Sequence, residues 1–125
     1  MKLFPILALT LAAHFAWADD ISGRAAAGRA TSATPQGSKF DQSLMPMLGK
    51  IGQICDPPGT VLPAAELGVF VLVGDITQAG ILTNVEVSPQ TPVSACFAAE
   101  MLKNHYDPPP RPGTYPIVVQ LTVTN

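Results

Sequence analysis

Hydrophobic and polar residues alternate with a period of two over much of the second half of the chain, which predicts β-strands there. The last run, Ile117–Val123, is the most regular. Residues 68–74 are apolar on both faces, which predicts a buried central strand, and Thr77–Gly80 predicts a tight turn after it. The next strand has one apolar and one polar face, as in an antiparallel sheet with a solvated side: Ile81, Thr83, Val85 and Val87 against Asn84, Glu86 and Ser88.

Two other segments have apolar residues at helical spacing. Leu44, Leu48, Ile51 and Cys55 predict a helix over Phe40–Cys55, with Asp41 as N-cap and Pro46 near the first turn. Thr91 and Pro92 form the start signal of a second helix, which we expect to run to about Asn104. The predicted order is α-β-β-α-β, an α+β fold in which helices pack on a small antiparallel three-stranded sheet.

The N-terminal segment has the pattern of an export signal. Lys2 precedes the apolar run Leu3–Phe15, which is too short to cross a bilayer, and Ala16-Trp17-Ala18 offers the small residues of a cleavage site. We therefore expect a cleavable signal peptide over residues 1–18 and a periplasmic protein; the alternative is an uncleaved membrane anchor. Residues 19–38 carry almost no large apolar side chain and are predicted to be a flexible tail, which leaves residues 39–125 as a single domain.

Charge and cysteine content narrow the class of protein. The chain has nine acidic and seven basic residues without a basic run, so nucleic acid is not an expected partner. Cys55 and Cys96 are the only cysteines, and in an oxidising compartment such a pair predicts one disulfide. The loop it would close spans 41 positions, which corresponds to a stabilisation of ~4 kcal/mol by chain entropy.

Candidate chemistry is sparse. His105 is the only histidine after the predicted signal. With Cys96 it could form a nucleophilic pair, and with Asp107 it could contribute two ligands to a metal site, which would need more. Asp75, Glu86 and Glu100 are placed singly along the chain, and no phosphate-binding, nucleophile-elbow or zincin motif occurs. We therefore predict no catalytic residue, no metal site and no cofactor.

Residues 68–125 resemble the C-terminal domain of TonB, TolA and related periplasmic proteins. In that family a glycine-led apolar strand, a T-x-x-G hairpin, an N-V-x-V strand followed by serine, a helix and an aromatic-x-P segment come in this order. The matching stretches here are Gly68–Gly80, Asn84–Ser88, a helix that carries Cys96, and Tyr106–Pro109 before the last strand. The resemblance implies the fold and a role in binding proteins. Energy-transducing members keep a membrane anchor and a long periplasmic reach, whereas a cleaved signal and a short tail would leave this domain without an anchor.

Three hypotheses of function follow. The first is a periplasmic, non-enzymatic interaction module that binds an envelope protein through a sheet edge, because the last strand has no interior charge or proline to protect it. Its candidate binding residues are Ile117, Val118, Val119, Gln120, Leu121 and Thr122, and the same edge could pair two copies into a homodimer. The second is an immunity or inhibitor protein that neutralises a cell-wall-degrading toxin or effector. The third is a thiol or metal enzyme.

The proline-rich stretch Pro108–Pro112 has two interpretations. It resembles a polyproline ligand for a groove in another protein, with Arg111 as a charged flank. It also suits a connection that positions the last strand, and this second interpretation is the preferred one.

Overall fold

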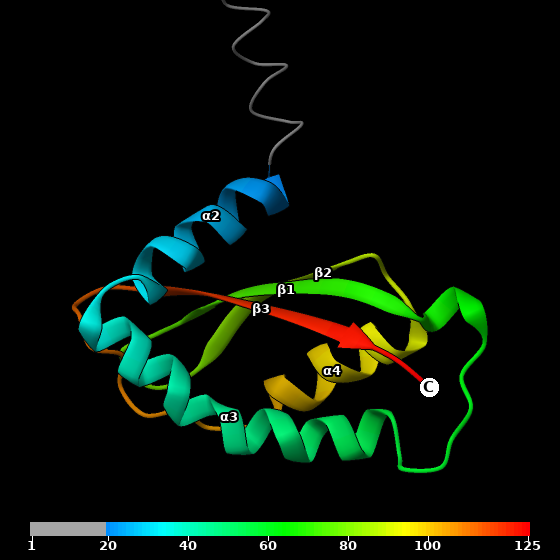
Figure 1. Ribbon diagram of the computed structural model, residues 1–125. Coiled ribbons are helices and arrows are strands. Elements are labelled where there is room, and N and C mark those ends of the chain that lie inside the picture. The colour runs from blue at the N-terminus through cyan, green and yellow to red at the C-terminus, as the bar shows by residue number, and fades with distance from the viewer. Residues whose placement is uncertain (1–19) are drawn as a thin grey trace, which may run out of the picture.

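A computed structural model describes residues 20–125, so the predicted signal peptide lies outside the described residues (Figure 1). The described chain is α+β, with three helices and a three-stranded antiparallel sheet in the order β2-β1-β3. This confirms the predicted fold class and the order α-β-β-α-β from the second helix onward. The elements are α2 (Asp20–Ser32), α3 (Pro35–Cys55), a 3₁₀ turn (Ala64–Glu66), β1 (Gly68–Ile76), β2 (Leu82–Ser88), α4 (Pro92–Leu102) and β3 (Tyr115–Val123).

The central strand is β1, as its two apolar faces predict. Leu72 and Val73 are neighbours in sequence and point to opposite faces, and both are completely buried. Leu72 belongs to the main core, whereas Val73 lies on the face that α2 crosses. Gly80 has a φ of +78° and closes the turn between β1 and β2, as predicted.

The alternation predicted for β2 is interrupted by a bulge. Val73 pairs with Glu86 and Asp75 with Thr83, so β2 has one residue more than β1 between these pairs. Asn84 takes up the extra residue with a φ of +54°. The prediction that Ile81 and Thr83 share a face with Val85 and Val87 is therefore wrong. Leu82 is the residue that enters the core, with 4% of its surface exposed, while Ile81 is 46% exposed.

The prediction of a flexible tail over residues 19–38 is wrong from Asp20 onward, because this segment forms α2 and the start of α3. Ala25, Gly28 and Thr31 are buried at a spacing of three, on the side that faces the sheet. A Cβ atom on Gly28 would lie 2.8 Å from the backbone nitrogen of Val118, so the helix lies almost directly on the β3 backbone. Small residues stabilise this contact because they let the helix backbone approach the sheet closely. Large apolar residues stabilise a contact by burying area, so a prediction based on them alone misses α2.

The helix α3 begins five residues earlier than the sequence pattern predicts. Thr34 is its N-cap, accepting a 3.0 Å hydrogen bond from the Gly37 nitrogen, so the prediction of Asp41 as N-cap is wrong. As a consequence Pro46 lies inside the helix and not in its first turn. The predicted C-terminal boundary at Cys55 is confirmed, and α4 begins at Pro92 with the predicted Thr91 cap.

The main core lies between one face of the sheet and the helices α3 and α4. Phe70 and Phe97 meet edge to face with their ring centroids 5.4 Å apart, and Met101 is fully buried beside them. The predicted disulfide is present: Cys55 at the end of α3 is bonded to Cys96 in α4, with 5.7 Å between their Cα atoms. Among residues 20–125 no helix combines the length and the apolar character needed to cross a membrane.

Candidate functional site: a groove beside the free edge of β3

The predicted binding segment, Ile117–Thr122, lies on an edge strand, because β3 pairs with β1 on one side only. The Thr31 hydroxyl donates a 3.0 Å hydrogen bond to the carbonyl of Pro116, so that carbonyl points away from β1. Outward and inward backbone groups alternate along an antiparallel strand. The N–H and C=O groups of Val118, Gln120 and Thr122 therefore also point outward. No side chain within residues 20–125 donates to or accepts from them.

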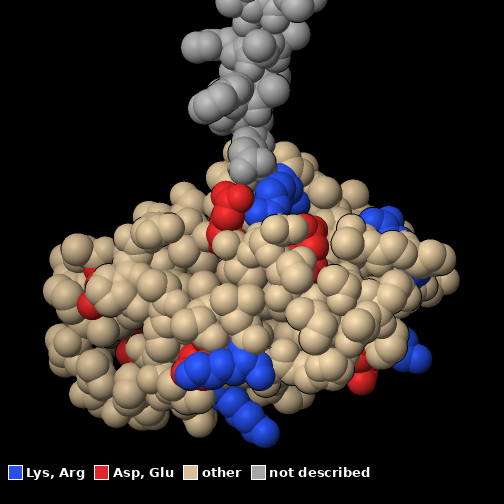
Figure 2. All heavy atoms as spheres, turned by 180° about the vertical axis from the view of Figure 1, so that it is seen from behind, with Lys and Arg blue, Asp and Glu red and all other residues tan. Residues whose placement is uncertain are grey.

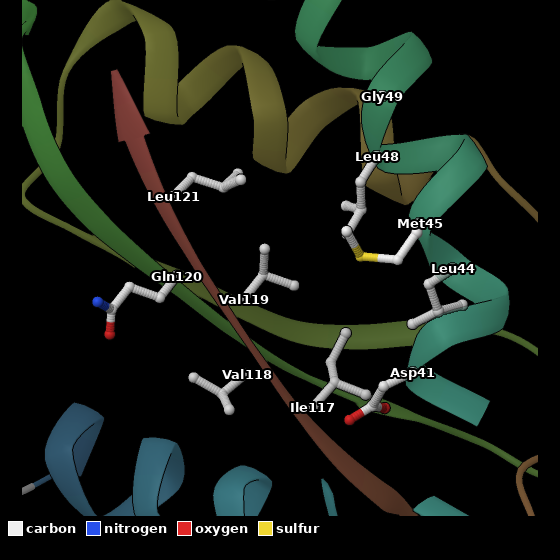
Figure 3. A pocket seen from close by; sticks show the side chains of 10 residues that line it. All are labelled: Asp41, Leu44, Met45, Leu48, Gly49, Ile117, Val118, Val119, Gln120 and Leu121. Carbon is white, nitrogen blue, oxygen red and sulfur yellow. The ribbon is translucent and has the colours of Figure 1, made fainter. Parts of the chain in front are cut away.

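An apolar groove follows this edge, with α3 as its opposite wall (Figure 3). Its volume is about 370 Å³. Ile117, Val119 and Leu121 point into it, while Val118 and Gln120 point to the other side, toward α2. The wall formed by α3 consists of Asp41, Leu44, Met45, Leu48 and Gly49.

The α3 wall was not predicted as part of a binding site. The helical pattern assigns Leu44 and Leu48 to the core, yet both also border the groove. Met45 is 61% exposed although it is a large apolar residue, and Gly49 has no heavy atom within 4 Å of where a Cβ would lie. A large apolar residue on the flank of the core stripe, next to Leu44 and Leu48, was the one signal in the sequence that the apolar surface of this helix extends beyond the core.

One end of the groove is polar. Asp41 is the only charged residue that lines it, and within residues 20–125 no basic side chain forms a salt bridge with it. The Ser32 hydroxyl donates a hydrogen bond to the Asp41 carboxylate. Among the described residues the carboxylate therefore has a single neutral donor, at a position where the groove meets solvent.

The hydroxyl group of Tyr115 lies buried close to this polar end. Burial raises its pKa, the Asp41 carboxylate raises it further, and Thr31 and Arg111 act in the opposite direction. The Thr31 hydroxyl gives its own proton to backbone carbonyls, and the Tyr115 oxygen is left without a hydrogen-bond partner in the described part of the chain. The ring packs edge to face against Phe40, with 5.2 Å between the ring centroids, so the core next to this end of the groove is firmly packed.

The groove wall is anchored at both ends of α3. Phe40 and Leu44 belong to the core near its start, and the disulfide to Cys96 fixes its last residue to α4. A wall held in this way changes little when a ligand enters, which reduces the entropy lost on binding.

The candidate nucleophilic pair does not form in this structure. The sulfur of Cys96 is bonded to Cys55, and a disulfide sulfur is not a thiolate. His105 is exposed and lies next to the β1–β2 turn, near Gly80. Over residues 20–125 no three His, Cys, Asp or Glu side chains come together as a metal site would require.

The carboxylates that are separate in the sequence are brought together around Arg24 of α2. Its guanidinium lies 3.5 Å from Asp75 and 2.9 Å from Glu86, and it also donates to the Asn84 carbonyl. Few charged side chains interrupt the surface seen in Figure 2, and acidic and basic atoms lie side by side close to the start of α2. This arrangement ties α2 to the sheet. Glu100 pairs instead with Lys103 on α4, at 2.9 Å.

The proline-rich connection is tied to the rest of the domain. The Gln78 side-chain amide donates to the carbonyls of Arg111 and Gly113, at 2.6 and 2.9 Å. The Arg111 guanidinium lies over the Tyr115 ring, 5.6 Å from its centroid. These contacts position the start of β3, as the preferred interpretation of this stretch predicts.

Comparison of the chain with models of known protein families and with curated proteins gives no match. The functional inference therefore depends on the groove, the edge strand and the sequence pattern.

Proposed function

We propose that this protein is a periplasmic, non-enzymatic interaction module with a TonB/TolA C-terminal-like fold, which binds an envelope protein along β3. The partner contributes an extended segment that adds a fourth strand to the sheet. The observation that carries the proposal is the outward-facing amide row of Val118, Gln120 and Thr122 beside the apolar groove under α3. Main-chain hydrogen bonds supply affinity in this mode of binding, and side-chain pockets supply specificity.

The two edges of the sheet differ in a way that supports this proposal. The β2 edge carries the Asn84 bulge and the charged Glu86, both of which discourage pairing with another strand. The β3 edge has neither a bulge nor a charged residue over Ile117–Val123. Helix α2 covers the start of this edge, where Thr31 donates to the Pro116 carbonyl and Gly28 lies on the Val118 backbone. The rest of the edge, at Gln120 and Thr122, is exposed, and an exposed edge is a hazard for aggregation unless a partner uses it.

The location and the resemblance supply the rest of the proposal. The apolar run before Ala18 has the pattern of an export signal, and a disulfide between Cys55 and Cys96 suits an oxidising compartment. The residues of β1, β2 and the Tyr106–Pro109 segment resemble periplasmic domains that bind other proteins. A free, disulfide-linked domain of this kind fits a binding role in the envelope.

The test uses a substitution that removes one outward N–H and leaves the rest of the sheet in place. Proline is tolerated on an edge strand where its nitrogen faces solvent, so Gln120→Pro should keep the fold and block strand addition. Gln120→Ala is the matched control, because it removes the same side chain and keeps the N–H. The full mature chain is used to capture its partner from a periplasmic extract, and affinity for the purified partner is then measured.

We expect Gln120→Pro to abolish partner binding, while Gln120→Ala binds about as well as the wild-type chain. Amide exchange in the complex should show new protection at Val118, Gln120 and Thr122. Equal binding by both variants, or protection confined to His105 and the residues before Phe40, would contradict strand addition. A captured cell-wall-degrading toxin would replace the envelope role with that of an inhibitor.

A further inference from the structure

The groove has a direction, because its two walls run side by side from a charged end to an apolar end. Asp41 of α3 lies next to Ile117 of β3, and Leu48 and Gly49 lie at the level of Leu121 (Figure 3). From position 41 to 48 the helix rises about 10 Å, and from 117 to 121 the strand advances about 13 Å. The groove therefore accommodates about five residues of an extended segment.

A segment added to β3 would place every second side chain in this groove. Side chains opposite Ile117, Val119 and Leu121 share their face of the sheet and so point toward α3. The positions opposite Leu121 and Val119 are surrounded by Leu48, Met45 and Leu44, which suits apolar side chains. The position opposite Ile117 lies beside Asp41, whose carboxylate has no basic partner within residues 20–125. It is the last position of the added segment, because beyond it Thr31 and Ser32 of α2 bond to the Pro116 carbonyl and to Asp41 and close the edge.

We propose that the partner is an antiparallel segment with two apolar residues two positions apart and a lysine or arginine two positions after the second. This inference rests on the proposed function and specifies the chemistry of its partner. Antiparallel pairing is chosen because the sheet is antiparallel throughout and such pairs are the more stable per residue. In that direction the partner enters at Leu121 and reaches Asp41 last, so the basic residue follows the apolar ones.

The probes are three capped synthetic peptides whose central residues differ only in charge or order. The first has the core Val-Thr-Leu-Thr-Lys, the second has Glu in place of Lys, and the third has the reversed order Lys-Thr-Leu-Thr-Val. Binding to the mature chain is measured by amide chemical shifts at low ionic strength, at peptide concentrations up to millimolar. We expect the first peptide to bind about tenfold more tightly than the second, a difference of about 1.4 kcal/mol, and more tightly than the third.

A charge exchange tests the assigned contact. Asp41→Lys should reverse the preference, so that the Glu peptide binds this variant better than the Lys peptide does. Gly49→Leu tests the apolar end: its side chain would fill open space in the groove without a backbone clash, so it should weaken binding of the Lys peptide. Gly23→Leu is its control, since Gly23 is also helical and exposed with no neighbour within 4 Å, but lies on α2 away from the groove.

The outcomes separate this inference from the proposed function. Equal binding of the Lys and Glu peptides, no reversal in Asp41→Lys, or preference for the reversed peptide overturns the partner rule, even if Gln120→Pro still abolishes binding of the natural partner. No shift with the Lys peptide at millimolar concentration also overturns it. If Gln120→Pro leaves natural binding intact, the proposed function itself fails, whatever the peptides do.

Discussion

The two faces of the sheet are covered in different ways, although β1 is equally buried on both. Behind Leu72 lie aromatic rings, Met101 and a disulfide, which join α3, α4 and the sheet into one core. Behind Val73 lies α2, which contacts the sheet through small residues and the ion pairs of Arg24. The first cover is stabilised by buried area and a covalent link, and the second by close approach of backbones.

This difference predicts that the domain does not open uniformly. Local stability follows the number of buried apolar contacts, and α2 has few large side chains to bury. We expect α2 to detach from the sheet at a lower free energy than that needed to separate α3 and α4. The four predictions that follow test this comparison, from the largest expected effect to the smallest.

Replacing both cysteines, Cys55→Ser with Cys96→Ser, should have the largest effect. The bond closes a loop of sequence separation 41, so its loss should lower the free energy of unfolding by ~4 kcal/mol. Chemical denaturation of the double variant, compared with the oxidised wild-type chain, measures this difference. A loss below about 1 kcal/mol would mean that the α3–α4 cover does not depend on the disulfide. The covalent link would then not be what distinguishes the two faces of the sheet.

Gly28→Val should release α2 and leave the main core in place. Its Cβ would lie 2.8 Å from the Val118 nitrogen and 2.9 Å from the Ile117 carbonyl carbon, and a strand backbone cannot move away without breaking its ladder. We expect a loss of about 2 kcal/mol, in the range of other overpacked sites. Hydrogen exchange should become faster in α2 and unchanged in α4.

Gly23→Val is the control for that experiment, because its added side chain meets nothing within 4 Å. The cost of a β-branched residue in a helix is the same in both variants, so the difference between them isolates the contact with β3. Faster exchange in α4 as well as in α2 would show that the two faces open together.

The core side of the comparison is tested by pH through Tyr106, which is 4% exposed and donates a 2.7 Å hydrogen bond to the Met101 carbonyl. Burial raises the pKa of Tyr106 to about 12, from the ordinary tyrosine value of 10.0. Because the folded pKa is the higher one, the unfolded chain loses this proton first as pH rises. The contribution of the neutral Tyr106 hydroxyl to the free energy of unfolding is complete below pH 10 and is lost between about pH 10 and 12.

At pH 11 the expected loss from this group is about 1.4 kcal/mol relative to pH 9. Tyr106→Phe removes the titrating group, so its stability should fall less steeply over the same interval, although its stability at pH 8 is about 1 kcal/mol lower for want of the hydrogen bond. Denaturation curves for both chains at pH 8, 9, 10 and 11 give the two slopes. Identical slopes would place the Tyr106 hydroxyl outside the alkaline transition.

The same contrast explains what could be predicted from the sequence. Large apolar residues with a clear period marked β1, β3, α4 and the end of α3, because burial of such residues determines where these elements pack. The spacing of large apolar residues does not predict α2, because the contact surface of this helix consists of Ala25, Gly28 and Thr31. It also does not predict the Asn84 bulge, which depends on how two strands pair.

For a similar reason, only one of the two walls of the groove, the β3 edge, could be predicted from the sequence. The sequence alone shows that the β3 edge carries no charge or proline to discourage strand addition. The α3 wall depends on how far this helix extends beside β3, and its true start at Pro35 is set by the Thr34 cap. A helix that begins five residues earlier brings Asp41 into its second turn, where the side chain borders the groove and does not cap the helix.

The smallest effect is expected at Arg24, where α2 meets the sheet through charge. Arg24→Met keeps an apolar stem of similar reach and removes the ion pairs with Asp75 and Glu86. Since the Glu86 side chain is 46% exposed, the pairing should contribute only about 0.5 kcal/mol and should weaken in high salt. A double-mutant cycle with Glu86→Gln, followed by denaturation at low and high ionic strength, measures that coupling.

A coupling near 2 kcal/mol that persists in salt would mean that charge, and not the close approach at Gly28, holds α2 in place. The second face would then resemble a buried polar network, and Gly28→Val should release α2 less completely than the geometry predicts.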